Sequence, residues 1–261
     1  MPARPQDAAV FHALHQDFLI LPNVWDAASA KIVERAGAKA VAWAHGFADG
    51  HDLPVAKLVT TVEEIARVTT LPITCDAEGG YADDPARVAE NVAALIGAGA
   101  VGINLEDGRD PHDLHLRKVE AARAAAERAG VNLYINARTD VYLKQLAPAE
   151  QALEETIRRG RAFKAAGASG LFVPFAMKPD DIRAIAATVE LPLNIMGWPG
   201  VPDAATLQPL GARRLSAATW MFRAAASAVA EAASAFLRTG DCEALAARAG
   251  DRTDFDALMR G

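Results

Sequence analysis

Short apolar runs alternate with longer alanine-rich segments along almost the whole chain. The short runs contain four or five residues each, a length typical of buried strands. They predict strands at Phe18–Leu21, Ala40–Ala44, Ile73–Asp76, Gly102–Glu106, Leu133–Ala137, Gly170–Val173, Leu193–Met196 and Arg213–Ser216. The longer segments predict helices at Ala27–Ala36, Ala56–Thr69, Pro85–Gly97, Leu114–Ala129, Pro148–Ala166, Pro179–Val189, Ala204–Pro209 and Ala217–Arg238.

Eight strand-then-helix units are the number found in a (β/α)8 barrel, and we predict that α/β fold. Turn residues agree with this pattern. Asp84 precedes Pro85 as a helix N-cap does, and Gly37, Gly99 and Gly167 each stand between a helix and a strand. Because no low-complexity linker divides the chain, we expect one domain over residues 1–261.

The segment 217–261 is predicted to form a C-terminal helical extension of the same domain. Its first helix, Ala217–Arg238, is strongly apolar, and Glu243–Arg248 and Phe255–Met259 resemble shorter helices. Such a surface needs to be covered by a second subunit or by the base of the barrel, so we expect a homo-oligomer.

Charge and composition exclude several classes of function. The formal net charge is −6, which offers no surface for nucleic acid, and 51% hydrophobic residues can fill a large core. No uncharged apolar stretch is long enough to span a membrane, and the N-terminus lacks the apolar core of a signal peptide. Only two cysteines, Cys75 and Cys242, are present, which favours a reducing, cytoplasmic setting.

Polar residues gather where the predicted strands end, which is where (β/α)8 barrels place their active sites. They are Asn23, Trp25, Asp26, His45, Asp49, Asp76, Glu78, Asn104, Glu106, Asp107, Asn136, Arg138, Asp140 and Asn194. A barrel needs far fewer polar side chains for its own stability. The sequence therefore predicts an enzyme.

Three of these acids form a candidate metal site. Side chains two residues apart on a strand point the same way, so Asp76 and Glu78 can aim at one point, and Glu106 can join them from the next strand. Oxygen donors of this kind suit Mg²⁺. The alternative role for Asp76 is to cap the next helix, but Asp84 is better placed for that. Asp107 alternates to the other side of its strand.

Arg138 and His45 each have a functional and a structural interpretation. A guanidinium at a strand end can clamp a carboxylate or phosphonate with two hydrogen bonds, or it can simply pair with a nearby acid. His45 can handle a proton or contact the substrate, or it can serve as a hydrogen-bonded structural residue. Cys75 should face outward as a small core residue. Gly79-Gly80 lacks the lysine of a phosphate-binding loop.

Several phrases in this order resemble the isocitrate lyase/phosphoenolpyruvate mutase superfamily, in its carboxyphosphonoenolpyruvate phosphonomutase-like branch. The resemblance covers about residues 21–246. It is carried by Leu21-Pro22-Asn23-Val24-Trp25-Asp26-Ala27-Ala28-Ser29-Ala30, Asp76-Ala77-Glu78-Gly79-Gly80-Tyr81, Ala98-Gly99-Ala100-Val101-Gly102-Ile103-Asn104-Leu105-Glu106-Asp107, Asn136-Ala137-Arg138-Thr139-Asp140 and Pro192-Leu193-Asn194. Together these phrases are specific, whereas any one alone would be weak.

The resemblance implies a barrel that binds Mg²⁺ or Mn²⁺ and acts on a small anionic 2-oxo acid or its enolate. It also implies a dimer or tetramer in which the eighth helix is swapped between subunits. By position, the metal residues are Asp76, Glu78 and Glu106, often reached through waters. The catalytic residues are Arg138, His45 and Asp49. The expected substrate-binding residues are Trp25, Asp26, His45, Gly46, Arg138 and Asn194.

Two loops depart from the family pattern. The lyases carry a Lys-Lys/Arg-Cys-Gly-His loop after the fourth strand, where this chain has the short Gly108-Arg109-Asp110-Pro111-His112-Asp113-Leu114. The acid/base cysteine is missing, which disfavours isocitrate and methylisocitrate cleavage. The loop after the second strand, up to Asp49, is several residues shorter than usual. We therefore expect His45 to replace part of the contacts that the backbone of this loop makes with the substrate carboxylate.

Three hypotheses follow. The first is a Mg²⁺-dependent lyase or decarboxylase that cleaves a C–C bond of a 2-oxo acid through a metal-stabilised enolate. The second is a P–C bond enzyme, a phosphonomutase or phosphonopyruvate hydrolase, which would use the same metal and arginine. The third is a ligand-binding barrel without turnover, because a fold does not fix a function.

Overall fold

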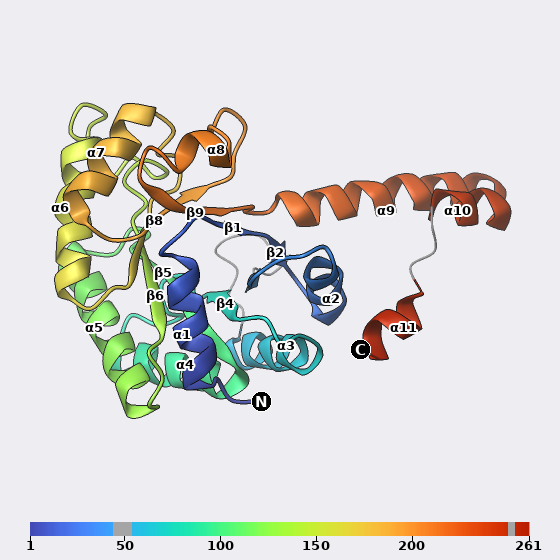
Figure 1. The fold of residues 1–261 in the computed structure, drawn as a ribbon, viewed down its shortest axis with the longest axis horizontal. Coiled ribbons are helices and arrows are strands. Elements are labelled where there is room, and N and C mark those ends of the chain that lie inside the picture. Colours follow the sequence, from blue (N-terminus) through green and yellow to red (C-terminus); the bar gives the residue numbers. More distant parts are fainter. Residues whose placement is uncertain (44–53, 250–253, 261) are drawn as a thin grey trace.

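A parallel sheet curls into a barrel that helices cover on the outside (Figure 1). The computed structural model describes residues 1–43, 54–249 and 254–260. Within them the strands are β1 Leu19–Leu21, β2 Asn23–Val24, β3 Val41–Trp43, β4 Ile73–Asp76, β5 Ala100–Glu106, β6 Tyr134–Arg138, β7 Gly170–Phe172, β8 Leu193–Met196 and β9 Ala212–Ser216. All pairings between them are parallel, in the order β1-β9-β8-β7-β6-β5-β4-β3-β2.

Two short strands, β1 and β2, lie on either side of Pro22, and together they close the barrel. β1 pairs with β9, whereas β2 pairs with β3, so one stretch of chain contacts both ends of the sheet. Pro22 separates these two strands because it has no N–H for a ladder hydrogen bond. Its carbonyl oxygen still accepts from the Ala42 amide at 3.1 Å. The strand predicted at Phe18–Leu21 is β1, shorter by one residue, whereas β2 was not predicted. The (β/α)8 barrel is confirmed.

The outer helices follow the predicted order with small shifts at their ends. They are α2 Ala27–Arg35, α3 Val55–Val68, α4 Pro85–Ala98, α5 His112–Arg128, α6 Ala152–Ala165, α7 Pro179–Val189 and α8 Ala204–Leu207. Asp84 caps α4 as predicted, since its side chain accepts from the Ala86 amide. Helix α6 begins at Ala152 instead of the predicted Pro148, because residues 149–151 form a turn.

Helix α1, Pro5–Leu14, covers the N-terminal end of the barrel and was not predicted. It buries Ala8 and Phe11 and leaves most other side chains exposed, so its sequence carries little helical periodicity. The Phe11 ring lies 5.3 Å from the ring of Tyr134, at the start of β6, and His15 stacks on the same ring at 4.0 Å. These rings place α1 against the bottom of β6.

The barrel interior is unusually polar. Asn136 of β6 donates to the side-chain oxygen of Asn104 of β5 at 2.9 Å, and Arg214 of β9 donates to the same oxygen at 3.4 Å. Arg214 is 1% exposed. Barrel interiors are more often filled with branched apolar side chains. Here polar side chains extend from the middle of the barrel to the rim where β4, β5 and β6 end.

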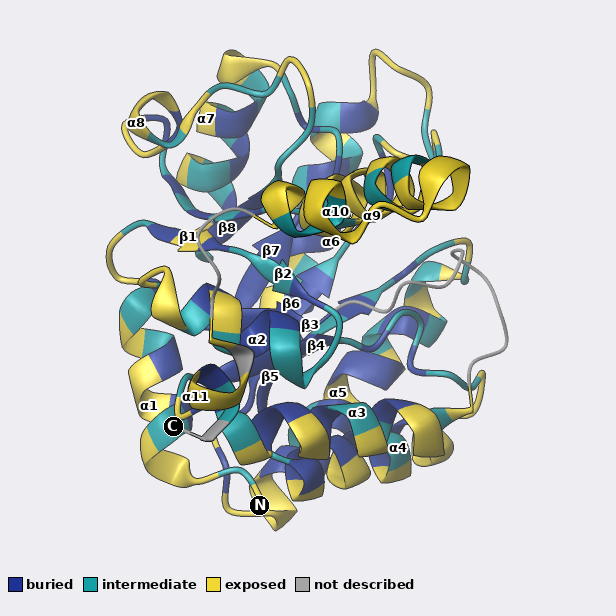
Figure 2. Cartoon of the chain, turned by 90° about the vertical axis from the view of Figure 1, so that its right-hand side faces the viewer, coloured by how far each residue is buried: buried dark blue, intermediate teal, exposed yellow. Residues whose placement is uncertain are grey.

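The C-terminal helices leave the barrel. Helix α9, Trp220–Thr239, projects away from it, with α10, Cys242–Arg248, at its far end and α11, Phe255–Arg260, turning back (Figure 1). No residue of α9 is buried, even though many of its side chains are apolar. Val229 and Leu237, for example, are 68% and 83% exposed. Figure 2 shows this exposure along α9 and α10. Within the described ranges, no helix is long and apolar enough to cross a membrane.

Candidate functional site

The polar residues predicted to form the site end three neighbouring strands. Asp76 ends β4, Glu106 ends β5 and Arg138 ends β6. Glu106 and Arg138 are direct partners in the β5–β6 register, and Asp76 lies beside Asn104 of β5. The carboxyl ends of parallel strands meet at one rim, so these three side chains share one side of the barrel mouth.

The loop after β4 holds Glu78 close to Glu106. The Glu78 amide donates to a carboxylate oxygen of Asp76 at 3.1 Å, and the Gly80 amide donates to the Ala77 carbonyl at 2.7 Å. Glu78 has a φ of 45°, in the left-handed region that disfavours a residue with a β-carbon. Its carbonyl oxygen accepts from the Glu106 amide at 2.8 Å. This hydrogen bond couples the turn after β4 directly to the end of β5.

The Glu106 carboxylate contacts two cationic side chains. Arg138 Nη1 lies 2.7 Å from one oxygen, and Lys144 Nζ lies 3.3 Å from the other. The Glu106 side chain is 16% exposed, so this pair of contacts is largely shielded from water. The acid predicted to bind metal and the arginine predicted to bind substrate therefore lie in direct contact.

Arg138 is anchored from behind by Asp140. Its Nε and Nη2 donate to the two oxygens of the Asp140 carboxylate at 2.7 and 3.2 Å, a fork-like contact. Lys144 contacts the same carboxylate at 2.8 Å. The Arg138 guanidinium also lies 5.6 Å from the centre of the Phe172 ring. These contacts fix the plane of the guanidinium at the barrel mouth.

Asp107 supports this arrangement from within the structure. It is buried and accepts from the Thr139 hydroxyl at 2.7 Å, the Asp140 amide at 2.9 Å and Arg159 Nη1 at 2.7 Å. These partners belong to the chain just after β6 and to α6. Asp107 thereby holds the backbone that carries Asp140.

The ionisation of the site reflects its burial. Burial raises the pKa of Glu106, and Asp76 and Asp140 raise it further, against the opposing effects of Arg138 and Lys144. Burial alone would lower the pKa of Arg138, but Glu106 and Asp140 raise it, so the guanidinium stays charged. For the same reason the pKa of Lys144 is raised. The rim thus combines crowded acids with two permanent cations.

The donor chemistry at this rim suits a hard cation, but the acids are not assembled as a cage. Within the described parts of the chain, no group of three or more histidine, cysteine, aspartate or glutamate side chains lies close enough to hold a metal directly. The reason is visible at Glu106, whose oxygens face Arg138 and Lys144. A cation held by Asp76, Glu78 and Glu106 would therefore have to be bound partly through water.

The other predicted substrate residues have varied surroundings. Asp26 caps α2 by accepting from the Ser29 amide at 2.7 Å, and the Trp25 ring contacts the Phe222 ring of α9 at 5.5 Å. Asn194 is buried inside the barrel, two residues before β8 ends, and accepts from the Ser216 hydroxyl at 3.3 Å. His45, Gly46 and Asp49 lie outside the described residues.

Two lysines at the site, Lys118 and Lys144, were not predicted from the sequence. Lys144 lies four residues after Asp140. In a helix this spacing would indicate an ion pair, but no helix was expected at these residues. Lys118 of α5 is buried, and its Nζ contacts Asp110 at 2.6 Å and the Gly79 carbonyl at 3.0 Å. No local pattern links these three residues, because their contact depends on how α5 packs beside the loops.

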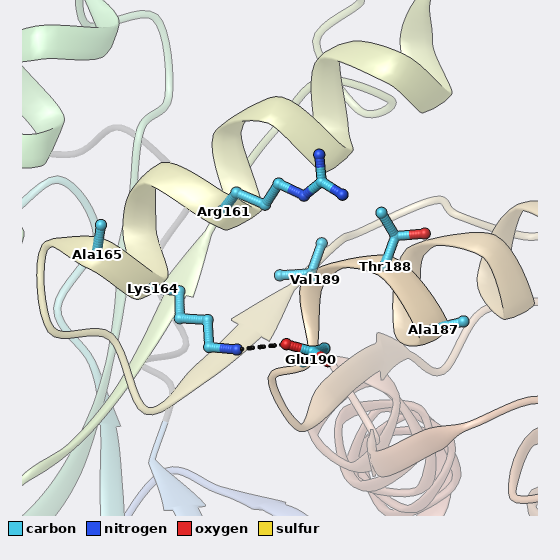
Figure 3. Close-up of a pocket in the computed structure, with 7 residues that line it drawn as sticks. All are labelled: Arg161, Lys164, Ala165, Ala187, Thr188, Val189 and Glu190. Carbon is cyan, nitrogen blue, oxygen red and sulfur yellow. Dashed lines mark hydrogen bonds and ion pairs between the residues drawn. The ribbon is translucent and has the colours of Figure 1, made fainter.

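Two cavities differ in their relation to this chemistry. One, of about 640 Å³, is a groove between α6 and α7 that contains the Lys164–Glu190 ion pair (Figure 3). None of the predicted site residues lines it. The other, of about 540 Å³, is lined by Glu78, Tyr81 and Glu106 and by the loop that follows β5. The second cavity is the one that adjoins the acids.

Residues 11–237 match the family model described as phosphoenolpyruvate phosphomutase. The chain belongs to the phosphoenolpyruvate phosphomutase family. The predicted membership of the isocitrate lyase/phosphoenolpyruvate mutase superfamily is therefore confirmed, and the match spans the whole barrel and most of α9.

Individual relatives of this phosphoenolpyruvate phosphomutase family member have different names. An uncharacterized protein of Mycobacterium tuberculosis (strain H37Rv) is 32% identical, over 86% of this chain and 88% of its own length. An oxaloacetate decarboxylase of Bradyrhizobium sp. is 30% identical, over 75% of this chain and 71% of its own. A solved structure from Burkholderia cenocepacia J2315, provisionally named a phosphonomutase, is 40% identical with a TM-score of 0.83, over 91% and 99% of the two chains.

These relatives confirm the expected kind of protein, an enzyme of the lyase and mutase type. Their names divide between C–C and P–C bond chemistry.

Proposed function

We propose that this protein is a Mg²⁺- or Mn²⁺-dependent lyase or decarboxylase that acts on a small 2-oxo acid. The observation that carries the proposal is the contact between Glu106 and Arg138 at the rim where β4, β5 and β6 end. It places Glu106, a carboxylate of the kind that binds metal ions, 2.7 Å from Arg138, a cation of the kind that binds carboxylates. The named oxaloacetate decarboxylase among the relatives supports this reaction class.

In this proposal, Asp76, Glu78 and Glu106 hold the cation, partly through water. A bound Mg²⁺ would supply Lewis-acid polarisation of the 2-oxo group. Glu106 would turn its carboxylate toward the cation, which releases N–H groups of Arg138 for the substrate carboxylate. Asp140 keeps the guanidinium in place through its two hydrogen bonds, so the clamp is oriented before substrate arrives.

Turnover assays test this proposal. Oxaloacetate and substituted malates are incubated with the wild type and with Glu106→Gln, with Mg²⁺ and with EDTA. We expect Mg²⁺-dependent turnover by the wild type and its loss in the variant. If the wild type turns over none of these acids, the proposed reaction is wrong.

A second candidate is a P–C bond enzyme, a phosphonomutase or phosphonopyruvate hydrolase. It is favoured by the 40% identity to the Burkholderia cenocepacia protein with the provisional phosphonomutase name. The same metal and Arg138 would serve it, since a phosphonate and a carboxylate accept similar hydrogen bonds. Turnover of phosphonopyruvate with inert oxaloacetate would select this candidate. Tight binding of either acid without any product would select the non-catalytic barrel.

We further propose a homo-oligomer in which α9 packs on a neighbouring subunit. The support is the exposed apolar surface of α9, which includes Met221, Val229 and Leu237. Exposed apolar surface of this kind normally marks an interface. The contacts of Trp220 with Gly197 and of Phe222 with Trp25 lie in the first turn of α9.

A further inference from the structure

The cavity of about 540 Å³ beside the acids is large enough for a small organic acid. One wall is the turn after β4, with Glu78 and Tyr81, and the other is the loop after β5, with Glu106 and Gly108. Lys118 of α5 closes the space between the two loops. The cavity therefore extends from the proposed metal end toward the loop that replaces the lyases' cysteine loop.

Two cations line this cavity, Lys118 and Arg109, and they differ in their contacts within the part of the chain that the structure describes. Lys118 already contacts Asp110 and the Gly79 carbonyl, and its side chain is 3% exposed. Arg109 is exposed and makes no hydrogen bond or ion pair with the part of the chain that the structure describes. The Arg109 guanidinium can therefore meet a ligand without first breaking an internal contact.

The base of Arg109 is held in a fixed turn. The Asp110 amide donates to the Asp107 carbonyl at 2.7 Å, and Gly108 adopts a φ of 53°, which a glycine tolerates readily. Asp107 itself is buried and held by three hydrogen bonds, and Asp110 is held by Lys118. A long cationic side chain thus projects from a rigid turn beside the cavity.

We propose that Arg109 determines specificity by binding a second anionic group on the substrate, a carboxylate or a phosphonate far from the 2-oxo group. This inference rests on the proposed function, which assigns the metal to Glu78 and Glu106 in the cavity wall and the first carboxylate to Arg138, in contact with Glu106. A substrate with one anionic group at each end would neutralise both cations, Arg138 and Arg109. The enzyme would then prefer dianionic 2-oxo acids to monoanionic ones of the same length.

Two acids of equal chain length test this preference. Oxaloacetate and 2-oxobutyrate differ only in a carboxylate in place of a methyl group. Their dissociation constants with saturating Mg²⁺ are measured by stopped-flow tryptophan fluorescence, before turnover, for the wild type, Arg109→Gln and Arg109→Lys. Phosphonopyruvate is the third ligand. Arg128→Gln, an exposed arginine at the opposite end of α5, is the matched control, and circular dichroism verifies folding.

We expect Arg109→Gln to weaken oxaloacetate binding by about tenfold or more, the effect of losing a charged hydrogen bond. Binding of 2-oxobutyrate should change less than about twofold. Arg109→Lys should fall between, because it keeps the charge but not the fork of donors. A larger loss for phosphonopyruvate than for oxaloacetate would identify the second group as a phosphonate, and the reverse as a carboxylate.

The inference is wrong if Arg109→Gln weakens oxaloacetate and 2-oxobutyrate equally, or weakens neither, while the wild type binds both. The proposed function would survive that result. If the wild type binds none of the three acids in the presence of Mg²⁺, the proposed function fails and the inference fails with it.

Discussion

The amide of Glu106 donates a 2.8 Å hydrogen bond to the carbonyl oxygen of Glu78. It joins the end of β5 to the turn after β4 at the point where each presents a carboxylate to the barrel mouth. Lys118 adds a second connection, since it contacts the Gly79 carbonyl on one side and Asp110 on the other. The two acids are therefore held together by contacts that do not involve their own carboxylates.

Substituting Lys118 should loosen both loops at once. Lys118→Met removes the contacts to Gly79 and Asp110 and keeps a side chain of similar length. We expect a loss of about 1–3 kcal/mol in the free energy of unfolding, because a buried ion pair is broken, together with weaker metal binding. Urea unfolding and Mn²⁺ titration measure the two effects. Lys164→Met, in the exposed pair with Glu190, should change neither, and equal effects in both variants would contradict this role for Lys118.

Arg138→Lys should impair substrate binding more than stability. Lysine keeps the charge but cannot contact Asp140 with two nitrogens while it binds a carboxylate. We expect the KM for a 2-oxo acid to rise by about tenfold or more, which steady-state kinetics measure. The control is Arg117→Lys on the exposed side of α5. An unchanged KM in Arg138→Lys would show that Arg138 only pairs with Glu106 and Asp140.

Buried histidines should make the protein sensitive to mild acid. Burial lowers the pKa of His15 and of His115 from 6.5 to about 3 in the folded chain. Between these values the unfolded chain binds more protons, so stability is complete above pH 6.5 and falls as the pH drops toward 3. At pH 5 each histidine should contribute about 2 kcal/mol of lost stability.

The variant His15→Phe keeps the ring stacked on Tyr134 but cannot be protonated. It should lose less stability than the wild type between pH 7 and pH 5, as measured by urea unfolding at each pH. An identical loss in both proteins would show that His15 does not account for the acid sensitivity.

Charges on α9 should separate the subunits if this helix packs on a neighbour. Val229→Glu and Leu237→Glu each place a carboxylate on its exposed apolar surface. We expect the double variant to be monomeric by light scattering after size-exclusion chromatography, and the wild type to be a dimer or tetramer. Val10→Glu, at an exposed site on α1, is the control and should leave the assembly intact. A monomeric wild type would refute the proposed assembly.

The sequence predicted the barrel well because its strands and caps are local signals. Asp84 and Pro85 mark the start of α4, and each strand is a short apolar run between turn residues. Helix α1 was missed because only Ala8 and Phe11 pack inward. Strand β2 was missed because it has only two residues, Asn23 and Val24, and is defined by its pairing with β3.

The site was predicted where residues act through their position on a strand. Asp76, Glu106 and Arg138 end neighbouring strands as expected. Lys118 and Lys144 were missed because they reach the site from α5 and from the turn after Asp140. The sequence allowed Arg138 to pair with a nearby acid, but it could not indicate that Glu106 contacts both Arg138 and Lys144, because that depends on rotamers and on the packing of the loops.

Binding of Mn²⁺ tests whether Asp76, Glu78 and Glu106 form the metal site of a 2-oxo acid enzyme. Free Mn²⁺ is measured by electron paramagnetic resonance during titration of the wild type, Glu78→Gln, Glu106→Gln and the exposed control Glu64→Gln. We expect one Mn²⁺ site per chain, from which Mg²⁺ displaces Mn²⁺, with an affinity about tenfold or more weaker in the two site variants and unchanged in the control. Equal affinity in all four proteins, or the absence of a site in the wild type, would contradict this expectation.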